Sequence, residues 1–442
     1  MPPLHWRLRE HLTLGAYTLK WLIISTLISL AIGSVSAWFL IALEWATRAR
    51  EATPWLLYCL PAAGVLVAAL YHYLGKSAEG GSDLIVDEIH EPGAGVPSRM
   101  TPLIFVGTVL THLCGGSAGR EGTAVQMGGS LASLFSRALK LGPEDRRTAL
   151  MAGVAGGFGA VFGTPLAGAV FAMEVLVIGS LRYDSILPCL IASLVSHWVC
   201  RAWGVHHAEY HIHSIATADG GGLVILKVAI SGICFGLAST FFSELTHGTQ
   251  SLFQKIRHPV IRPVVGAVAV IALTRLLGTR DYLGLGVSSS DPGAVTILSS
   301  FGSEGAHAWS WWWKSVFTAL TLGSGFKGGE VTPLFYIGAT LGNVLSGLMS
   351  APASLFAALG FVAVFAGATN TPLACTIMGV ELFGAEHVVP LAVACFVSYL
   401  FSGHSGIYLS QRVGAPKHGR GPSPGASLRS ILADRARGRE SR

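Results

Sequence analysis

The sequence is poor in charged residues. Only 12% of its 442 residues are Asp, Glu, Lys or Arg, whereas 51% are hydrophobic and the mean hydropathy is +0.56. About 25% of the residues of a typical soluble domain are charged, so this composition excludes a soluble globular protein. A membrane-spanning helix needs about 20 apolar residues, and several stretches reach that length. We therefore expect an all-α polytopic membrane protein.

Clusters of metal-binding side chains are also scarce. The seven cysteines are scattered and form no CxxC pair, so neither a disulfide framework nor a zinc site is expected. Four histidines fall within the loop His206–His213, where Glu209 is the only acid. Such a loop could bind a metal, but a solvated loop is the simpler interpretation. We expect no metal and no cofactor.

Motifs of membrane-embedded enzymes are missing. The chain has no HExxH and no complete Walker motif GxxxxGK[S/T], and it has only 24 acidic residues. A purely structural scaffold would not need the paired glycine-glutamate loops described below. The sequence therefore favours a transport function over an enzyme or a structural scaffold.

Positive charge is concentrated at the end of the chain. The segment from Lys417 to Arg442 carries seven basic residues against two acids, which is +5 of the net +6. It is rich in Gly, Pro and Ser, so we expect a disordered tail. Basic termini stay in the cytoplasm, and Arg7 and Arg9 place the N-terminus there too. The tail has no interleaved aromatics, so nucleic acid is not an expected partner.

The most unusual stretch is Gly-Arg-Glu-Gly-Thr at residues 119–123, followed by small and apolar residues that can form a helix. Glycine lets backbone N–H groups approach a small ligand closely. A helix start attracts an anion, and it equally attracts the carboxylate of Glu121. A site that either can fill is a candidate gate. The alternative is an ordinary acid in a first helical turn.

Two motifs recur in the second half of the chain. Gly-Arg-Glu-Gly-Thr at 119–123 matches Gly-Gly-Glu-Val-Thr at 328–332, an offset of 209, and Thr-Pro-Leu-Ala occurs at both 164–167 and 371–374, an offset of 207. Ordered matches at nearly constant spacing indicate an internal repeat. Two similar halves with short, broken helices are typical of inverted-repeat transporters, in which the starts of half-helices meet near the midplane.

The repeat suggests a division of the chain and pairs two further acids. Glu174 and Glu381 share the offset of 207. This symmetry favours helix capping or structural pairing, while an accessory transport role for Glu174 stays open. We expect an interfacial helix at 1–13, repeat 1 at 14–205, a polar loop at 206–221, repeat 2 at 222–414 and the basic tail at 415–442.

These motifs resemble those of the CLC family of anion channels and proton-coupled antiporters. The likeness rests on Gly-Arg-Glu-Gly at 119–122, Gly-Gly-Glu-Val-Thr-Pro at 328–333 and Tyr408, and it covers about 14–414. It implies the CLC fold of two inverted repeats of tilted and broken helices. It also implies a homodimer with one pore per subunit, transporting fluoride or chloride and protons in a lipid bilayer.

The resemblance also implies roles for particular residues. Glu121 would be the gating, proton-coupled glutamate, and Val331 and Thr332 would offer backbone N–H groups to the anion. Glu330 would either belong to the inner site or pair with Lys327. The implied anion-binding residues are Ser82, Gly122, Glu330, Val331, Thr332 and Tyr408.

Departures from the chloride-exchanging members indicate a subclass. Those members carry a proton-relay glutamate where this chain has Val175, directly after Glu174. The segments 87–90 and 325–333 resemble the fluoride-exporting subclass, which also lacks the relay acid. We therefore expect a fluoride/proton antiporter of a bacterial inner membrane with both termini cytoplasmic. The alternative is a chloride channel or chloride/proton exchanger, which Ser82 favours slightly.

Overall fold

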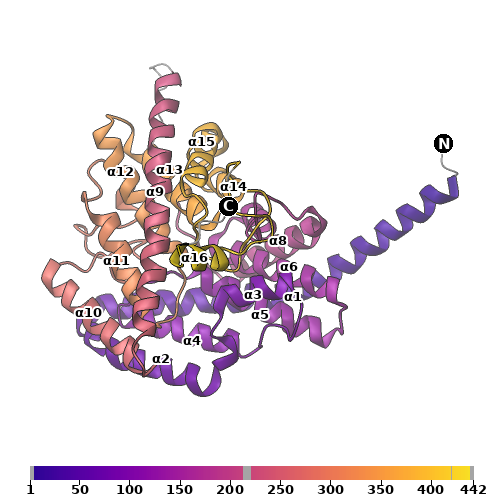
Figure 1. Ribbon diagram of the computed structural model, residues 1–442, viewed down its shortest axis with the longest axis horizontal. Helices are drawn as coiled ribbons and strands as arrows, with labels where there is room; N and C mark the ends of the chain where they lie inside the picture. The colour runs from indigo at the N-terminus through magenta and orange to yellow at the C-terminus, as the bar shows by residue number, and fades with distance from the viewer. Residues whose placement is uncertain (1–3, 213–220, 420, 439–442) are drawn as a thin grey trace.

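The computed structural model describes residues 4–212, 221–419 and 421–438. The chain is almost entirely helical, and the described strands are two residues long (Figure 1). The helices in the first half are α1 (Leu4–Ala52), α2 (Leu60–Leu74), α3 (Gly81–His90), α4 (Met100–Leu113), α5 (Glu121–Ala138), α6 (Pro143–Phe162), α7 (Pro165–Glu174) and α8 (Ile186–Ala202). Those in the second half are α9 (Gly221–Gln254), α10 (Ile261–Leu277), α11 (Ser310–Gly323), α12 (Val331–Leu348), α13 (Ala353–Thr369), α14 (Pro372–Phe383), α15 (Val388–Phe401) and α16 (Leu428–Ala436). Strands β1 (Val177–Ile178) and β2 (Arg412–Val413) pair in parallel.

Several helices are long and apolar enough to cross a membrane. Within the described ranges there are five such candidates: Glu10–Ala52, Pro54–Leu74, Tyr183–Ala202, Gly222–Gln254 and Val331–Leu348. Other apolar helices, such as α7 and α14, span only 10 and 12 residues. Because about 20 residues are needed to span the bilayer, the short helices end inside it. This combination confirms the predicted all-α polytopic fold built from broken helices.

The two halves of the chain repeat the same order of helices. Helix α11 begins 210 positions after α4, and α12 begins 210 positions after α5. Further along, α14 begins 207 positions after α7. The predicted offset of 209 for the glycine-glutamate loops is therefore wrong by one residue. Glu121 is the first residue of α5, whereas Glu330 caps α12 and corresponds in position to Arg120.

The two repeated loops meet back to back. Gly119 and Gly329 form an antiparallel bridge, in which the N–H of Gly119 donates to the carbonyl of Gly329 over 2.6 Å and the reverse bond measures 2.8 Å. A Cβ on Gly329 would lie 2.7 Å from the backbone nitrogen of Gly122. Only glycine allows this approach. The contact brings the starts of α5 and α12 together in the interior.

Helices α6 and α13 form the centre of the two halves. Every residue from 149 to 162 in α6 and from 354 to 369 in α13 is buried. A helix buried on all sides has no amphipathic face, which fits its apolar, glycine-rich sequence. Both end in a left-handed residue, Gly163 with φ 77° and Asn370 with φ 57°. The chain then turns directly into α7 or α14.

Glutamates at the ends of α7 and α14 cap each other's helices. The carboxylate of Glu174 accepts the N–H groups of Leu373 and Ala374 at 3.1 and 2.8 Å. In the same way, Glu381 accepts the N–H groups of Leu166 and Ala167 at 2.9 and 2.8 Å. These N–H groups lie in first helical turns and have no acceptor within their own helix.

Both ends of the chain differ from the prediction. Helix α1 runs without a break through the expected boundary at residue 13, and its first part projects from the body with residues 10–20 exposed (Figure 1). The expected disordered tail instead contains α16, whose N-cap Ser427 accepts the N–H of Ser430. Residues 1–3, 213–220, 420 and 439–442 lie outside the described residues, and so does His213 of the histidine-rich loop.

We predict that Glu381→Ala lowers the thermal stability of the purified protein by several degrees, and that Glu174→Ala has the same effect. Each change leaves two first-turn N–H groups without an acceptor, at a cost of roughly 1–3 kcal/mol. Glu381→Gln keeps one acceptor oxygen and should lose less. The exposed Glu386 is the matched control, since Glu386→Ala removes no cap. Equal melting temperatures for Glu381→Ala and Glu386→Ala would contradict the capping role.

Candidate functional site

The carboxylate of Glu121 contacts the start of α12, a helix of the other repeat. As predicted, α5 begins at Glu121. Its Oε2 accepts the backbone N–H of Thr332 at 3.0 Å and a hydrogen bond from the Thr332 hydroxyl. The N–H and the Nε of Arg120 lie 3.3 and 3.4 Å from its two oxygens. Glu121 is only 2% exposed.

This arrangement explains how a carboxylate is held in the interior. The N–H of Thr332 belongs to the first turn of α12, where N–H groups have no acceptor within the helix and carry partial positive charge. Arg120 adds a full positive charge at one side. The same donors would suit a small anion, because a helix start is a general anion-binding feature. Glu121 therefore occupies a place that an anion can also fill.

Three of the predicted anion ligands line one cavity, which we call the tail-side pocket. This pocket of about 180 Å³ is lined by Ser82, Glu330 and Tyr408 among others. The hydroxyl of Tyr408 is buried and has no hydrogen-bond partner among the described residues. Gln126 donates to the Ser82 hydroxyl at 3.4 Å. A buried hydroxyl without a partner is costly, so the Tyr408 hydroxyl is suited to a ligand.

Gly122 is the second residue of α5, and Val331 is the first residue of α12. Both are buried at the helix starts, with Val331 only 1% exposed. A Cβ on Gly122 would lie 3.0 Å from the Cα of Gly329 and 3.7 Å from a carboxylate oxygen of Glu330. The structure therefore gathers the predicted anion-binding residues around the crossing of the two loops.

Of the two alternatives for Glu330, pairing with Lys327 is not seen among the described residues. Lys327 Nζ lies over the ring of Tyr71, 4.0 Å from its centroid, and forms no ion pair with Glu330. Both side chains line the tail-side pocket. Glu330 thus faces the pocket, in keeping with the other alternative.

The hydrogen bonds and ion pair of Glu121 among the described residues involve neither Glu174 nor Val175. The Glu174 carboxylate is used in capping α14, which is the geometry of the capping alternative. Val175 is 3% exposed, and its carbonyl accepts the side-chain N–H of Gln411 at 2.7 Å. No acid stands at the relay position.

A larger cavity borders Arg120, and we call it the loop-side cavity. It has a volume of about 580 Å³ and is lined by Arg120, His206 and His207 among others. A small space of about 20 Å³ continues from Arg120 and His207 to Glu121 and Thr332. This small space includes Thr332 and the tail-side pocket includes Glu330, so both lie at the start of α12. In the described part of the chain, no group of three or more His, Cys, Asp or Glu side chains is placed to hold a metal.

Aromatic residues beside Glu121 were not anticipated from the sequence. Phe335 and Phe361 line the small space and stack with ring centroids 4.0 Å apart and an interplanar angle of 2°. Phe162 meets Phe335 edge to face at 5.0 Å. A phenylalanine in a buried helix looks like ordinary core, so only its neighbourhood distinguishes it.

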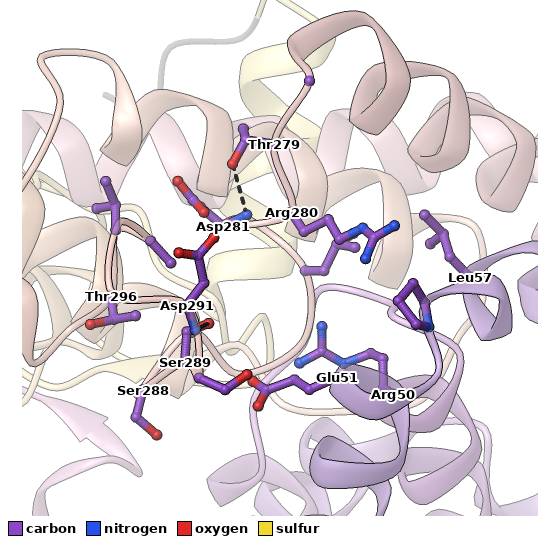
Figure 2. Close-up of a pocket in the computed structure, with 17 residues that line it drawn as sticks. Arg50, Glu51, Leu57, Thr279, Arg280, Asp281, Ser288, Ser289, Asp291 and Thr296 are labelled. Atoms are coloured by element: carbon purple, nitrogen blue, oxygen red, sulfur yellow. Dashed lines mark hydrogen bonds between the residues drawn. The ribbon is translucent and has the colours of Figure 1, made fainter.

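Figure 2 shows a second cavity on the loop side, of about 420 Å³. Arg50 from the end of α1 and Arg280 from the loop after α10 line it, and so do Glu51, Asp281 and Asp291. It shares Glu51 and three serines with the loop-side cavity. Neither Glu121 nor any of the predicted anion-binding residues lines this second cavity, so it is separate from the candidate anion site.

Comparison with known proteins assigns the chain to a family. The model of the voltage gated chloride channel family matches residues 63–403. A protein of Pseudomonas syringae pv. tomato, named chloride/fluoride channel protein, is 47% identical over 422 residues, which is 94% of this chain and 91% of the relative. The chain therefore belongs to the voltage gated chloride channel, or CLC, family, whose members are channels and transporters.

One solved structure and one further relative show which members of the family this chain is similar to. The solved structure of a CLC-type fluoride/proton antiporter matches with a TM-score of 0.84 and 34% identity, covering 89% of this chain and 98% of that one. The H(+)/Cl(-) exchange transporter ClcA of Klebsiella pneumoniae subsp. pneumoniae is 28% identical over 69% of this chain and 66% of its own. The match to the first structure confirms the two inverted repeats.

We predict that Gly329→Ala reduces anion flux roughly tenfold or more while the protein still reaches the membrane. The new methyl group would press on the backbone of Gly122, and overpacking of about 1–3 kcal/mol would part the two helix starts. Gly347 near the end of α12 is the control, because a Cβ there meets nothing within 4 Å. Wild-type flux in Gly329→Ala would show that the crossing does not position the site.

Proposed function

We propose that this chain is a fluoride/proton antiporter that exports fluoride, with Glu121 as its gate. The observation that carries the proposal is the Glu121 carboxylate on the N–H and hydroxyl of Thr332. A carboxylate in this place excludes an anion by occupying the same donors and by repulsion. One protonatable group thus decides whether the anion path is open.

The cycle follows from the charge of Glu121. Ionised, the side chain stays on the start of α12 and closes the path. Protonation removes its charge and weakens its bonds to Thr332, because hydrogen bonds to an ionised acceptor are the stronger ones. A fluoride ion then takes the vacated N–H group, and Glu121 carries its proton away from the site. Return of the ionised carboxylate displaces the anion, so proton and anion movements are coupled.

Several features favour fluoride over chloride. Val175 replaces the relay acid of the chloride exchangers, so Glu121 serves as the main proton carrier. Two similar proteins are described as a chloride/fluoride channel and as a fluoride/proton antiporter. Fluoride is small and strongly hydrated, and the buried N–H and hydroxyl donors of Thr332, with the hydroxyl of Tyr408, replace part of its water shell.

A chloride channel or chloride/proton exchanger is the second candidate. Ser82 supports it, because the chloride-transporting members carry serine there, and its hydroxyl lines the tail-side pocket. Either function would use the same gate. The two are told apart by competition between the halides in one flux assay.

The proposal includes an assembly and an orientation. The protein would be a homodimer with one pore per subunit, placed in a bacterial inner membrane with both termini in the cytoplasm. The tail-side pocket would then open to the cytoplasm, and the loop-side cavity to the outside. Fluoride would be collected through the pocket lined by Lys327 and Tyr408 and released past Arg120.

The test is fluoride efflux from liposomes that contain the protein, with fluoride and pH electrodes read together. The proposal predicts fluoride loss accompanied by proton uptake. Excess chloride should slow the fluoride flux only weakly. Rapid chloride flux without fluoride-coupled proton movement would overturn it in favour of the second candidate.

We predict that Glu121→Gln abolishes proton coupling. Glutamine is similar in shape to a protonated glutamic acid but cannot ionise, so the gate can neither carry a proton nor close by charge. Proton uptake should fall to the level of empty liposomes. Glu386→Gln is the control, because it removes an exposed carboxylate that lines neither the tail-side pocket nor the loop-side cavity. Proton uptake at the wild-type ratio in Glu121→Gln would place the gate elsewhere.

A further inference from the structure

The end of the chain folds back over the tail-side pocket. Strand β2 pairs with β1, the N–H of Leu428 donates to the carbonyl of Gln411 at 3.0 Å, and the N–H of Arg429 donates to the carbonyl of Leu409 at 2.9 Å. In Figure 1, α16 lies near the middle of the molecule. The start of α16 is thereby fixed to the segment that follows Tyr408.

Arg429, at the start of α16, reaches α3. Its guanidinium lies 3.2 Å from a carboxylate oxygen of Asp83 and 3.8 Å from one of Asp87, and it donates to the Ser410 hydroxyl at 3.3 Å. The other oxygen of Asp83 accepts the backbone N–H of Ser410 at 3.1 Å. Asp83 thus binds both the guanidinium of Arg429 and the backbone N–H of Ser410.

These contacts join the two segments that carry the pocket's hydroxyl groups. Asp83 directly follows Ser82 on α3, and Ser410 is two residues after Tyr408. Ser82, Asp83 and Tyr408 all line the tail-side pocket. Separation of α3 from the segment at 408–410 would move one hydroxyl away from the other. The network of Asp83, Arg429 and Ser410 opposes that separation.

We propose that Arg429 is a positioning residue that holds α3 against the segment at 408–410 and so sets the spacing of the Ser82 and Tyr408 hydroxyls around the anion. This inference rests on the proposed function, since it takes the tail-side pocket as the anion's path. Arg429 acts through Asp83 and does not contact the anion. The basic tail therefore belongs to the transport machinery.

The expected effect is modest. The Arg429 side chain is 57% exposed and that of Asp83 is 22% exposed, so water screens the pair. Exposed ion pairs are worth about 0.2–1 kcal/mol, which is at most about a fivefold change in an equilibrium constant. The second bond, from Ser410 to Asp83, remains when Arg429 is replaced.

The test is fluoride binding to the full-length purified protein, measured by calorimetry. Arg429→Gln should weaken fluoride affinity about two- to fivefold, with the melting temperature unchanged within a degree or two. Arg429→Lys should recover part of the affinity. The double variant Asp83→Arg with Arg429→Asp, which exchanges the two charges, should bind fluoride more tightly than Asp83→Arg or Arg429→Asp alone. Arg437→Gln, an exposed arginine just past α16, is the matched control and should bind as the wild type does.

Transport of the same variants distinguishes the two proposals. Arg429→Gln should keep the wild-type ratio of protons to fluoride, because Glu121 is untouched. Affinity equal to the wild type in Arg429→Gln would overturn the positioning role, and so would an equal loss in Arg437→Gln. A wild-type protein that binds fluoride but moves no protons would overturn the antiport mechanism instead, and the binding comparison would still decide on Arg429.

Discussion

One interaction sets the rest of the structure: the Glu121 carboxylate bonds to the start of a helix from the opposite repeat. In the apolar interior of a membrane protein, an ionised acid costs about 2.5–3.5 kcal/mol on insertion scales unless it is satisfied. The N–H and hydroxyl of Thr332 and the charge of Arg120 satisfy it here. Because the donors belong to a helix start, they serve an anion equally well. Competition between the two occupants is the physical basis of the proposed coupling.

The surrounding fold brings the starts of α5 and α12 together. The reciprocal bonds between Gly119 and Gly329 hold the loops together, and glycine is required because the backbones nearly touch. Around them, α6 is buried from residue 149 on and α13 from residue 354 on, and the acids of α7 and α14 cap each other's first turns. The first turns of α7 and α14 thus have N–H groups satisfied by the other repeat, which allows these helices to begin inside a membrane.

Much of this architecture could be predicted from the sequence, because composition and repetition depend on few assumptions. The apolar composition indicated the membrane, and the recurring Gly-x-Glu and Thr-Pro-Leu-Ala motifs indicated the repeat. The register could not be predicted. Aligning Glu121 with Glu330 matches letters, whereas the helix starts, which are set by hydrogen bonds, align Glu121 with Val331. The order of the tail was also missed, because a Gly/Pro-rich, basic composition does not reveal contacts such as Arg429 with Asp83.

The central claim is that Glu121 and the anion compete for the start of α12, and fluoride binding as a function of pH tests it most directly. Calorimetry on the wild-type protein should show affinity that rises as the pH falls, because protonation of Glu121 frees the donors of Thr332. In Glu121→Gln the affinity should be high and independent of pH. Equal affinities in the two proteins at neutral pH, or the same pH dependence in both, would contradict the account.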